Sequence, residues 1–375
     1  MNYKLELIRD SVRNFAEQEI RPYTREIDEG RFYPDKLLKM MADQQLMGVT
    51  IPREYGGAGL GFQELSVVLE EIARVCASST MHITSSNTLV GQVFLEFATE
   101  EQKKQYLVPL AKGEVTATFA LSEPEAGSDA LAMSTKAEED GDNYILNGRK
   151  TFITNALESE FIVVFAVTNS TNIARGTTAF IVDRNTEGMI IGKPENKMGM
   201  NGSNTSDVLL RNVVINKNQV LGRIGSGFKM AMKSLDMGRI GVAAQAVGIG
   251  QSAVDEAVQF TKKRVQFGRS ISSMQGVRFM LADMQTRLSV ARAMVEKVAR
   301  KIDEKEKIGA EASIAKYYAT ETCVKIAGDA LQLHGGYGYT KDYAIERIFR
   351  DSRVTTIYEG TSQIQQILIA RDLLD

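Results

Sequence analysis

The chain has 375 residues, of which 43% are hydrophobic and 25% are charged. These shares are typical of globular proteins, so a mainly disordered chain is excluded and several sizeable cores can form. Lys plus Arg number 45 and Asp plus Glu number 47, which leaves a net charge of -2. Because no basic surplus is available to neutralise a phosphate backbone, we expect no nucleic acid as a partner.

Few residues could serve as metal ligands of the thiolate or imidazole type. The only cysteines are Cys76 and Cys323, far apart in the sequence, and the only histidines are His82 and His334. A thiolate zinc site, a multi-histidine centre and a disulfide framework each need more of these residues. Counting these residues does not rule out a site made of carboxylates, but we assign no metal.

The sequence shows neither the pattern of a targeting peptide nor that of a membrane-spanning segment. The first twenty residues carry four acidic side chains and no continuous apolar stretch, which argues against a signal or transit peptide. The longest weakly polar run, Ile240 to Gly250, is far shorter than the ~20 residues of a membrane span. We expect no membrane span, and a cytoplasmic protein in a prokaryote or a mitochondrial matrix protein if the chain is a processed eukaryotic one.

Elements of three kinds follow one another along the chain. Helical patterns come first, at Asp10 to Glu19, Pro34 to Leu46, Phe62 to Val75 and Glu100 to Leu110. They predict an α-helical domain over residues 1–114.

β-branched and aromatic runs replace these patterns from Val115 to Ile215. The runs are VTATFAL, YILNG, FIVVFAV, TTAFIV and SDVLL, and Asp140-Gly141 and Asn147-Gly148 between them are hairpin signals. We predict a β domain over residues 115–225.

No proline follows Pro194, so long uninterrupted helices become possible. Apolar residues step by four and three from Val277 to Ile302, and similar stretches run from about Phe228 to Val265, Ala310 to Leu333 and Asp342 to Leu373. Four long helices with short connections predict an antiparallel bundle over residues 226–375. The fold class is therefore α+β and multidomain.

Two loop segments could carry chemistry, although each also has a plain structural interpretation. Leu121 to Ser128 ends a predicted strand with hydroxyl side chains and a glycine, which suits contact with a ring or a phosphate as well as an ordinary turn. Ile357 to Gln363 places a carboxylate, Glu359, at the mouth of a helix, where capping is the simplest explanation. The glycine clusters at 56–59, 222–227 and 335–338 lack the strand and helix context of a Rossmann or P-loop site.

The combination of segments resembles the acyl-CoA dehydrogenase family over the whole chain. Four separated places carry the resemblance: 121–129, Phe152 to Asn155, Arg264 to Phe267 with Gln275, and 332–339 followed by 358–363. Short-chain, butyryl-type members are the most similar. The resemblance implies an α domain, a β-barrel-like middle domain and a C-terminal four-helix bundle, assembled as a homotetramer (a dimer of dimers) with one FAD per subunit.

The same resemblance assigns the catalytic base to Glu359. In this role the carboxylate removes the α-proton of an acyl thioester while the β-hydride passes to the flavin, and a dry pocket would raise its proton affinity. Some family members take the base from the position that Gly238 occupies here, and glycine cannot serve. This substitution favours Glu359 and disfavours isovaleryl-type or long-chain activity.

Cofactor and substrate contacts also follow from the resemblance. The expected FAD contacts are Phe119, Leu121, Ser122, Ser128, Phe152, Ile153, Thr154, Arg264, Phe267, Gln275, Gln332, Gly335, Gly336, Thr361 and Gln363. Several of them come from a neighbouring subunit in the family. Phe152 stands where many relatives have tryptophan, so a stacking face remains but the indole donor is lost. The expected substrate contacts are Ser128, Asp236, Arg239 and Gly360.

These expectations describe an FAD-dependent dehydrogenase that converts a short-chain acyl-CoA to its trans-2-enoyl-CoA and passes electrons to an electron-transferring flavoprotein. The same half-reaction also runs in reverse, so an enoyl-CoA reductase, for example within an electron-bifurcating complex, is the alternative. A flavin oxidase or monooxygenase on the same scaffold and a non-catalytic acyl-CoA-binding protein are further rivals. The sequence does not fix acyl length, branching or physiological direction.

Overall fold

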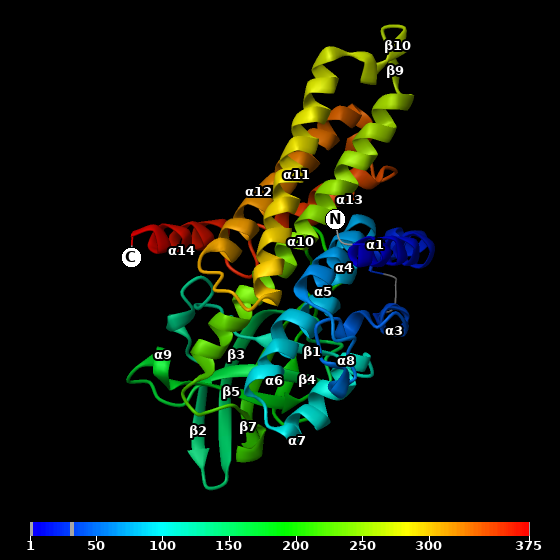
Figure 1. Cartoon of the computed structure of the whole chain (residues 1–375). Helices are drawn as coiled ribbons and strands as arrows, with labels where there is room; N and C mark the ends of the chain where they lie inside the picture. Colours follow the sequence, from blue (N-terminus) through cyan, green and yellow to red (C-terminus); the bar gives the residue numbers. More distant parts are fainter. Residues whose placement is uncertain (1–2, 31–33, 375) are drawn as a thin grey trace.

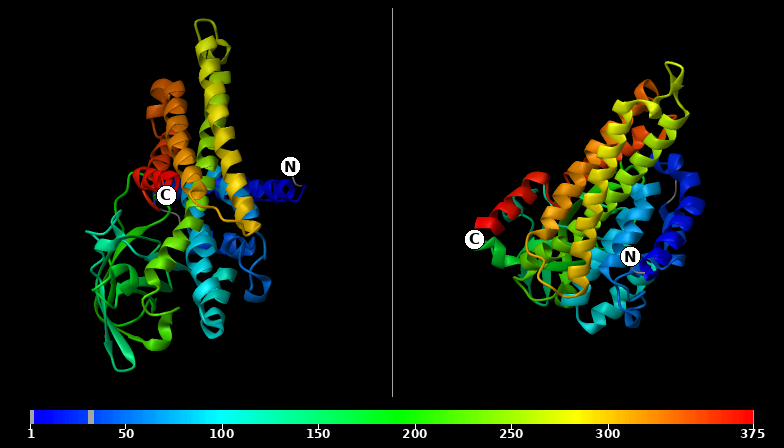
Figure 2. Two further views of the ribbon diagram at one scale, coloured as in Figure 1. Left: turned by 60° about the vertical axis from the view of Figure 1, so that its left-hand side comes forward. Right: turned by 45° about the horizontal axis from the view of Figure 1, so that its top comes forward.

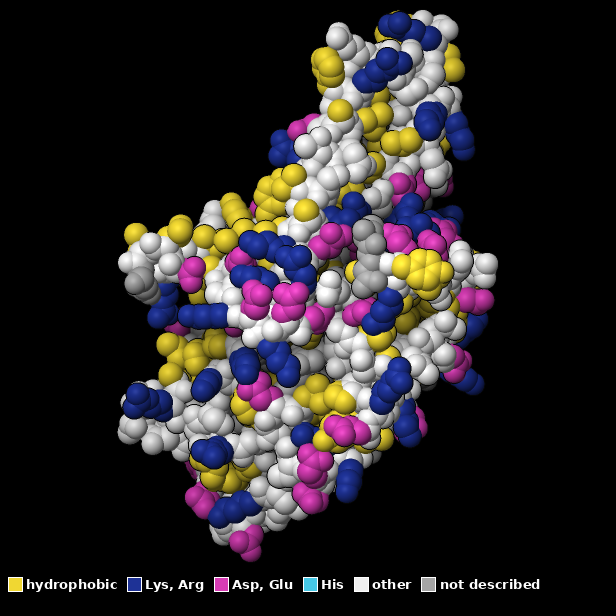
Figure 3. All heavy atoms as spheres, in the orientation of Figure 1, with side chains coloured by type: hydrophobic (Ala, Val, Ile, Leu, Met, Phe, Trp, Pro, Cys, Tyr) yellow, Lys and Arg dark blue, Asp and Glu magenta, His cyan; other side chains and the backbone are white. Residues whose placement is uncertain are grey.

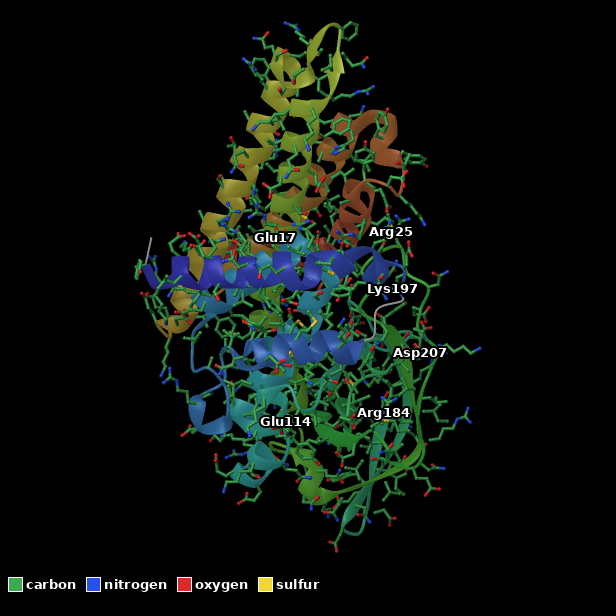
Figure 4. All side chains as sticks on the ribbon, turned by 90° about the vertical axis from the view of Figure 1, so that its right-hand side faces the viewer. Glu17, Arg25, Glu114, Arg184, Lys197 and Asp207 are labelled. Atoms are coloured by element: carbon green, nitrogen blue, oxygen red, sulfur yellow. The ribbon has the colours of Figure 1, made fainter. Side chains whose placement is uncertain are left out.

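A computed structural model describes residues 3–30 and 34–374 (Figure 1). Its N-terminal part is helical. The helices are α1 (Tyr3–Phe15), α2 (Thr24–Asp28), α3 (Pro34–Asp43), α4 (Phe62–Val75), α5 (Thr80–Thr84), α6 (Val90–Phe97), α7 (Glu100–Gln102) and α8 (Val108–Lys112). A π-helical turn, Ser85–Leu89, joins α5 to α6. Figure 4 shows α1 lying across the lower end of the long helices, with Glu17 on the π-helical turn Ala16–Ile20 that continues it.

The middle part forms an eight-stranded sheet with the order β6-β7-β3-β2-β4-β5-β8, in which β1 pairs with β4. The strands are β1 (Ala117–Ala120), β2 (Lys136–Asp140), β3 (Asn143–Thr154), β4 (Phe161–Val167), β5 (Thr177–Asp183), β6 (Met189–Ile191), β7 (Thr205–Asn216) and β8 (Val220–Leu221), and the short helix α9 (Ile173–Gly176) precedes β5. Strand β4 is buried along its whole length because both faces of the sheet are covered there.

One of the two predicted hairpin turns is wrong. Asp140 pairs with Asn143, so Asp140-Gly141 does begin the turn between β2 and β3. Asn147-Gly148 instead lies inside β3, where the pairing with β7 shifts register between Leu146 and Gly148. A Cβ at Gly148 would lie 2.4 Å from Thr135 Oγ1, so glycine is needed there for close contact rather than for a turn.

The C-terminal part contains the long helices α10 (Gly227–Lys263), α11 (Gln275–Asp303) and α12 (Glu311–His334), followed by α13 (Ala344–Val354) and α14 (Ser362–Leu374). A small hairpin of β9 (Val265–Gln266) and β10 (Arg269–Ser270) joins α10 to α11 at the end of the bundle that lies far from the sheet (Figure 1). The predicted fourth long helix is two helices, because the chain turns at Glu359 and Gly360 with positive φ values of 52° and 93°.

The architecture is α+β and multidomain, with N-terminal helices, a β sheet in the middle and a C-terminal helical bundle, as predicted. Figure 2 shows α4 and α1 beside the long helices and the sheet below them. Within the described ranges, no helix is both long and apolar enough to cross a membrane. Figure 3 shows acidic and basic side chains interspersed over one face, in keeping with the near-zero net charge.

Candidate active site

Glu359 occupies the turn between α13 and α14, and it does not cap the helix that follows. The capping bond is made by Thr361, whose Oγ1 accepts a hydrogen bond from the backbone N–H of Ile364 at 3.3 Å. Glu359 itself has a left-handed backbone conformation, which a non-glycine residue adopts only where its surroundings impose it. The turn therefore directs this side chain away from the helix N-terminus.

The Glu359 side chain is half-buried, and its carboxylate lies against Gly238 of α10. Its Oε2 atom is screened from solvent and has no hydrogen-bond partner among residues 3–30 and 34–374. A Cβ at Gly238 would lie 2.0 Å from this oxygen and 3.0 Å from Leu89 Cδ2, so the carboxylate fills space that a side chain at 238 would take. Burial raises the pKa of Glu359 to about 7, although Lys316 and Arg239 oppose the rise.

Two donors hold the turn through the carbonyl oxygen of Gly360. Lys316 Nζ donates to it at 2.6 Å and Gln365 Nε2 donates to it at 2.9 Å. Both side chains are fully buried. Burial lowers the pKa of Lys316 to about 8, and the negative charge of Glu359 opposes that change.

Asp236 and Arg239, which lie three residues apart on α10 on either side of Gly238, form an ion pair. Arg239 is buried, and its Nε atom has no partner in the described structure. Burial lowers the pKa of Arg239 and raises that of Asp236. The two expected substrate contacts on α10 thus lie beside the Glu359 turn, together with Gly360 in the turn itself.

Tyr358 anchors the other side of the turn. Its hydroxyl hydrogen-bonds to Gln245 Oε1, and Gln245 Nε2 donates to Thr80 Oγ1 at 2.6 Å. This chain of contacts connects the turn to α10 and α5. Burial raises the pKa of Tyr358 well above its usual value, so this phenol stays protonated.

Strand β1 and the loop after it carry four of the expected cofactor contacts. Phe119 lies on β1 and packs against Phe165 with ring centroids 4.7 Å apart. Leu121 and Ser122 are half-buried, whereas Ser128 is exposed further along the same loop. A hydrogen bond fixes the backbone of Ser122: its carbonyl oxygen accepts from the backbone N–H of Thr151 at 3.0 Å.

A buried ion pair fixes this loop to β3. Lys150 Nζ lies 2.7 Å from Glu123 Oε1 and 3.0 Å from the carbonyl oxygen of Leu121, and both charged side chains are almost fully buried. The Glu123 carboxylate also accepts hydrogen bonds from the backbone N–H groups of Ser134 and Thr135. Burial raises the pKa of Glu123, but Lys150 and these donors outweigh burial and lower it to about 2.

The second segment expected to hold the flavin, Phe152 to Thr154, is not a loop but the end of strand β3, where the pairing with β7 is irregular. Phe152 has a positive φ of 56° and is 68% exposed. Ile153 is buried in the core of the sheet, so its backbone alone could reach a ligand. The carbonyl oxygen of Thr154 already accepts a hydrogen bond from Thr118 Oγ1 at 2.6 Å, which connects this end of β3 to β1.

The remaining expected contacts lie in two other places. Thr361 and Gln363 follow Glu359 at the start of α14, where Gln363 is exposed. Arg264, Gln332, Gly335 and Gly336 line a groove of about 510 Å³ at the far end of the bundle.

In that groove the Arg264 guanidinium lies 5.0 Å from the ring centroid of Tyr337. Phe267, at the tip of the β9–β10 hairpin, is 92% exposed, and Gln275 begins α11. Figure 1 shows this end of the bundle far from the sheet and its loops. The expected cofactor contacts of one chain therefore form two separated groups.

Three residues that position the site were missed from the sequence. Lys316, Gln365 and Lys150 are buried polar side chains, each in direct contact with a loop that was singled out. A signal for one of them exists: Lys316 interrupts an otherwise small and apolar run, ASIAKYYA, in a predicted bundle helix. A lysine at such a position needs a buried partner.

Sequence models of one family cover nearly the whole chain. The acyl-CoA dehydrogenase N-terminal domain matches residues 3–114, the middle domain matches 118–213 and the C-terminal domain matches 225–374. The chain belongs to the acyl-CoA dehydrogenase family. It is thus an oxidoreductase of the class that acts on CH–CH groups.

Among similar proteins, the 3-(aryl)acrylate reductase of Clostridium sporogenes is 52% identical over 98% of both chains. The caffeyl-CoA reductase-Etf complex subunit CarC of Acetobacterium woodii is 45% identical over 98% of this chain and 97% of its own. The structure of butyryl-CoA dehydrogenase from Megasphaera elsdenii has a TM-score of 0.97 and 36% identity, covering 100% of this chain and 99% of that one.

The cofactor of the family is FAD. The residues of this chain fit it: Phe152 offers an exposed aromatic face beside the Leu121 to Ser128 loop, and the Arg264 groove offers a cation for a phosphate. Within the described ranges, no group of three His, Cys, Asp or Glu side chains is placed to hold a metal ion.

Proposed function

We propose that this protein interconverts a saturated acyl-CoA and its trans-2-enoyl-CoA, with Glu359 exchanging the proton at Cα, and that reduction of the enoyl thioester is its working direction. The observation that carries the proposal is the Glu359 carboxylate: its Oε2 is screened from solvent and has no hydrogen-bond partner in the part of the chain that the structure describes, and burial raises its pKa to about 7. At neutral pH such a group is present in both protonation states, so it can give a proton as readily as it takes one.

FAD, when bound, supplies hydride exchange at the β-carbon. The residues of the chain do the rest. Glu359 holds the proton, and its backbone N–H is proposed to stabilise the thioester oxygen as negative charge develops. Arg239, Asp236, Gly360 and Ser128 are proposed to contact the substrate. Ile153 can take part in flavin binding only through its backbone, because its side chain belongs to the core.

The reducing direction and an aryl-bearing substrate are supported by the relatives. The two reductases are 52% and 45% identical to this chain, whereas a short-chain specific acyl-CoA dehydrogenase of Clostridium acetobutylicum is 41% identical. We therefore place a 3-arylacrylyl thioester first. Oxidation of a short-chain acyl-CoA is the second candidate, favoured by the similarity to butyryl-CoA dehydrogenase.

We further propose an electron-transferring flavoprotein as the redox partner and a homotetramer as the assembly. The name of the Acetobacterium relative, a reductase-Etf complex subunit, supports the partner. The two separated groups of expected FAD contacts support sharing of each FAD between subunits. Oxygen consumption during turnover would instead favour the flavin oxidase alternative.

Stopped-flow absorbance of the flavin tests the proposal in both directions. Reduced enzyme mixed with cinnamoyl-CoA or crotonyl-CoA should regain flavin colour, and oxidised enzyme mixed with butyryl-CoA should lose it. Glu359→Gln should bind FAD and thioester but slow both changes by ~10²- to 10⁴-fold. Near wild-type rates in this variant would remove Glu359 from the mechanism. Faster reaction with crotonyl-CoA than with cinnamoyl-CoA would favour the short-chain candidate.

A further inference from the structure

Lys316 is a fully buried lysine in the second turn of α12, and it faces the Glu359 turn. Its residue exposure is 0%, and its Nζ donates to the carbonyl oxygen of Gly360 at 2.6 Å. Burying an ammonium group without a compensating charge is costly. The position of Lys316 therefore needs an explanation beyond packing.

The hydrogen bond to Gly360 does not by itself explain the charge. Gln365 Nε2 donates to the same carbonyl oxygen at 2.9 Å, and it does so with a neutral amide. The turn thus has a donor that costs less to bury. What Lys316 adds, and Gln365 does not, is a positive charge close to Glu359.

The titratable groups around Glu359 come from three elements. Helix α10 contributes Arg239, which is already paired with Asp236. Helix α12 contributes Lys316 and, further away, Glu321, which accepts a hydrogen bond from Ser362. The turn contributes the neutral phenol of Tyr358, and the contact from the π-helical segment is the apolar Leu89.

Among the described residues, Lys316 is therefore the cation near Glu359 that has no carboxylate paired with it at ion-pair distance, whereas Arg239 is already balanced by Asp236. We propose that Lys316 is a positioning residue for proton transfer: it fixes the Glu359–Gly360 turn through the Gly360 carbonyl, and its charge keeps the Glu359 carboxylate able to ionise in a dry site. The inference rests on the proposed function only in taking Glu359 as the proton-transfer group.

The expected consequence is an upward shift of the Glu359 pKa when the Lys316 charge is removed. Burial raises the Glu359 pKa and Lys316 is the strongest of the groups that lower it. Without that charge the carboxyl should remain protonated to higher pH. Oxidation, which needs the carboxylate, should then require more alkaline solution, and reduction, which needs the acid, should persist to higher pH.

Infrared difference titration of the FAD-loaded enzyme measures the protonation of Glu359 without any turnover. The carboxylic acid C=O band of Glu359 is identified by its absence in Glu359→Gln. In the wild type its midpoint should lie near 7. In Lys316→Met and Lys316→Gln the midpoint should rise by about one unit or more, as expected for loss of a neighbouring opposite charge.

Gln365→Met is the matched control, because it removes a donor to the same carbonyl oxygen without changing charge. This variant should slow flavin reduction because the turn is held less firmly, but the pH midpoint of the Glu359 titration should not change. Lys316→Arg, which keeps the charge, should keep the wild-type midpoint. If Lys316→Met fails to fold, Lys316→Gln decides the question with the same measurement.

An unchanged midpoint in Lys316→Gln, or an equal shift in Gln365→Met, would overturn the proposal and leave Lys316 a structural residue. Failure of this proposal can be distinguished from failure of the proposed function. The infrared band reports the protonation of Glu359 even if no thioester reacts, whereas the stopped-flow experiment tests the reaction even if the band does not shift.

Discussion

Gly238 on α10 and Glu359 between α13 and α14 share one space: a Cβ at position 238 would lie 2.0 Å from Glu359 Oε2. Real Cβ atoms do not approach an oxygen so closely, so one of the two must change if the other does. The Glu359 carboxylate thus requires that position 238 has no side chain. A base at 238 and a base at 359 could not occupy this geometry together.

We predict that Gly238→Ala displaces the Glu359 carboxylate and slows flavin reduction strongly while the protein still folds. Alanine is the better helix former by up to ~1 kcal/mol, so backbone propensity opposes any destabilisation. Stopped-flow bleaching by butyryl-CoA and a thermal melt on the same sample measure the two effects.

Gly328→Ala on α12 is the control for this prediction. The nearest atom to its added Cβ is Phe349 Cε2 at 3.7 Å, an ordinary contact. This variant should match or slightly exceed the wild-type stability and keep its activity. If both variants kept full activity, the close approach at Gly238 would have no role in placing the carboxylate.

The raised pKa of Glu359 predicts a pH-dependent cost in stability. The carboxyl titrates near 4.5 in the unfolded chain and at about 7 in the folded one, so the folded state binds the extra proton between these values. Its stability therefore falls as pH rises through this window, by on the order of 3 kcal/mol at most.

Glu359→Gln removes that cost because an amide does not titrate. Its melting temperature should equal or only slightly differ from that of the wild type near pH 5 and should exceed it near pH 8. Melts of both proteins across this range measure the difference. A difference that shrinks as pH rises would contradict the raised pKa.

Lys150→Met should destabilise the protein by ~3–5 kcal/mol, because it leaves the buried carboxylate of Glu123 without its cation. The loop from Leu121 to Thr135 should loosen with it and retain FAD less firmly. Chemical denaturation and the flavin absorbance after gel filtration measure the two losses.

Two variants check the cause of that effect. Arg149→Met, in the neighbouring residue, breaks an exposed ion pair with Asp207 and should cost at most ~1 kcal/mol. Adding Glu123→Gln to Lys150→Met removes the stranded charge and should recover part of the stability. A double variant no better than the single one would place the cost in packing instead.

Mixing two inactive variants should restore activity if FAD sites are shared between subunits. In a hybrid of Glu359→Gln and Arg264→Ala chains, one site combines the intact Glu359 of one chain with the intact Arg264 of the other. Refolding the two variants together should give activity that neither has alone. Activity no higher than that of the separate variants would place both groups in the same FAD site of one chain.

Much of the fold follows from local sequence patterns. Helix α4 begins and ends at the predicted residues, and the runs rich in β-branched residues lie in strands. The segment Thr80 to Leu89 gave no periodic signal, because its helical turns are buried on nearly all sides and include polar residues such as Asn87. Periodicity identifies a helix only when one face meets water.

The candidate site was predicted unevenly. Glu359 could be named from the resemblance, but its partners could not, because contacts between α12 and the turn join residues more than forty positions apart. The Glu123–Lys150 ion pair could not be predicted either, because in the sequence Glu123 is an ordinary charged residue of a loop and Lys150 one of a strand. Only the packed structure shows which charges are removed from water.

The largest hydrophobic core has consequences for how the chain is made. It joins α1, α3 and α4 to α10 through α13, so residues from both ends of the sequence bury one another. A ribosome releases the first helices long before α10 exists to cover them. The early chain must therefore hold an uncovered apolar face during synthesis, and a fragment ending before Gly227 should aggregate or recruit chaperones rather than fold alone.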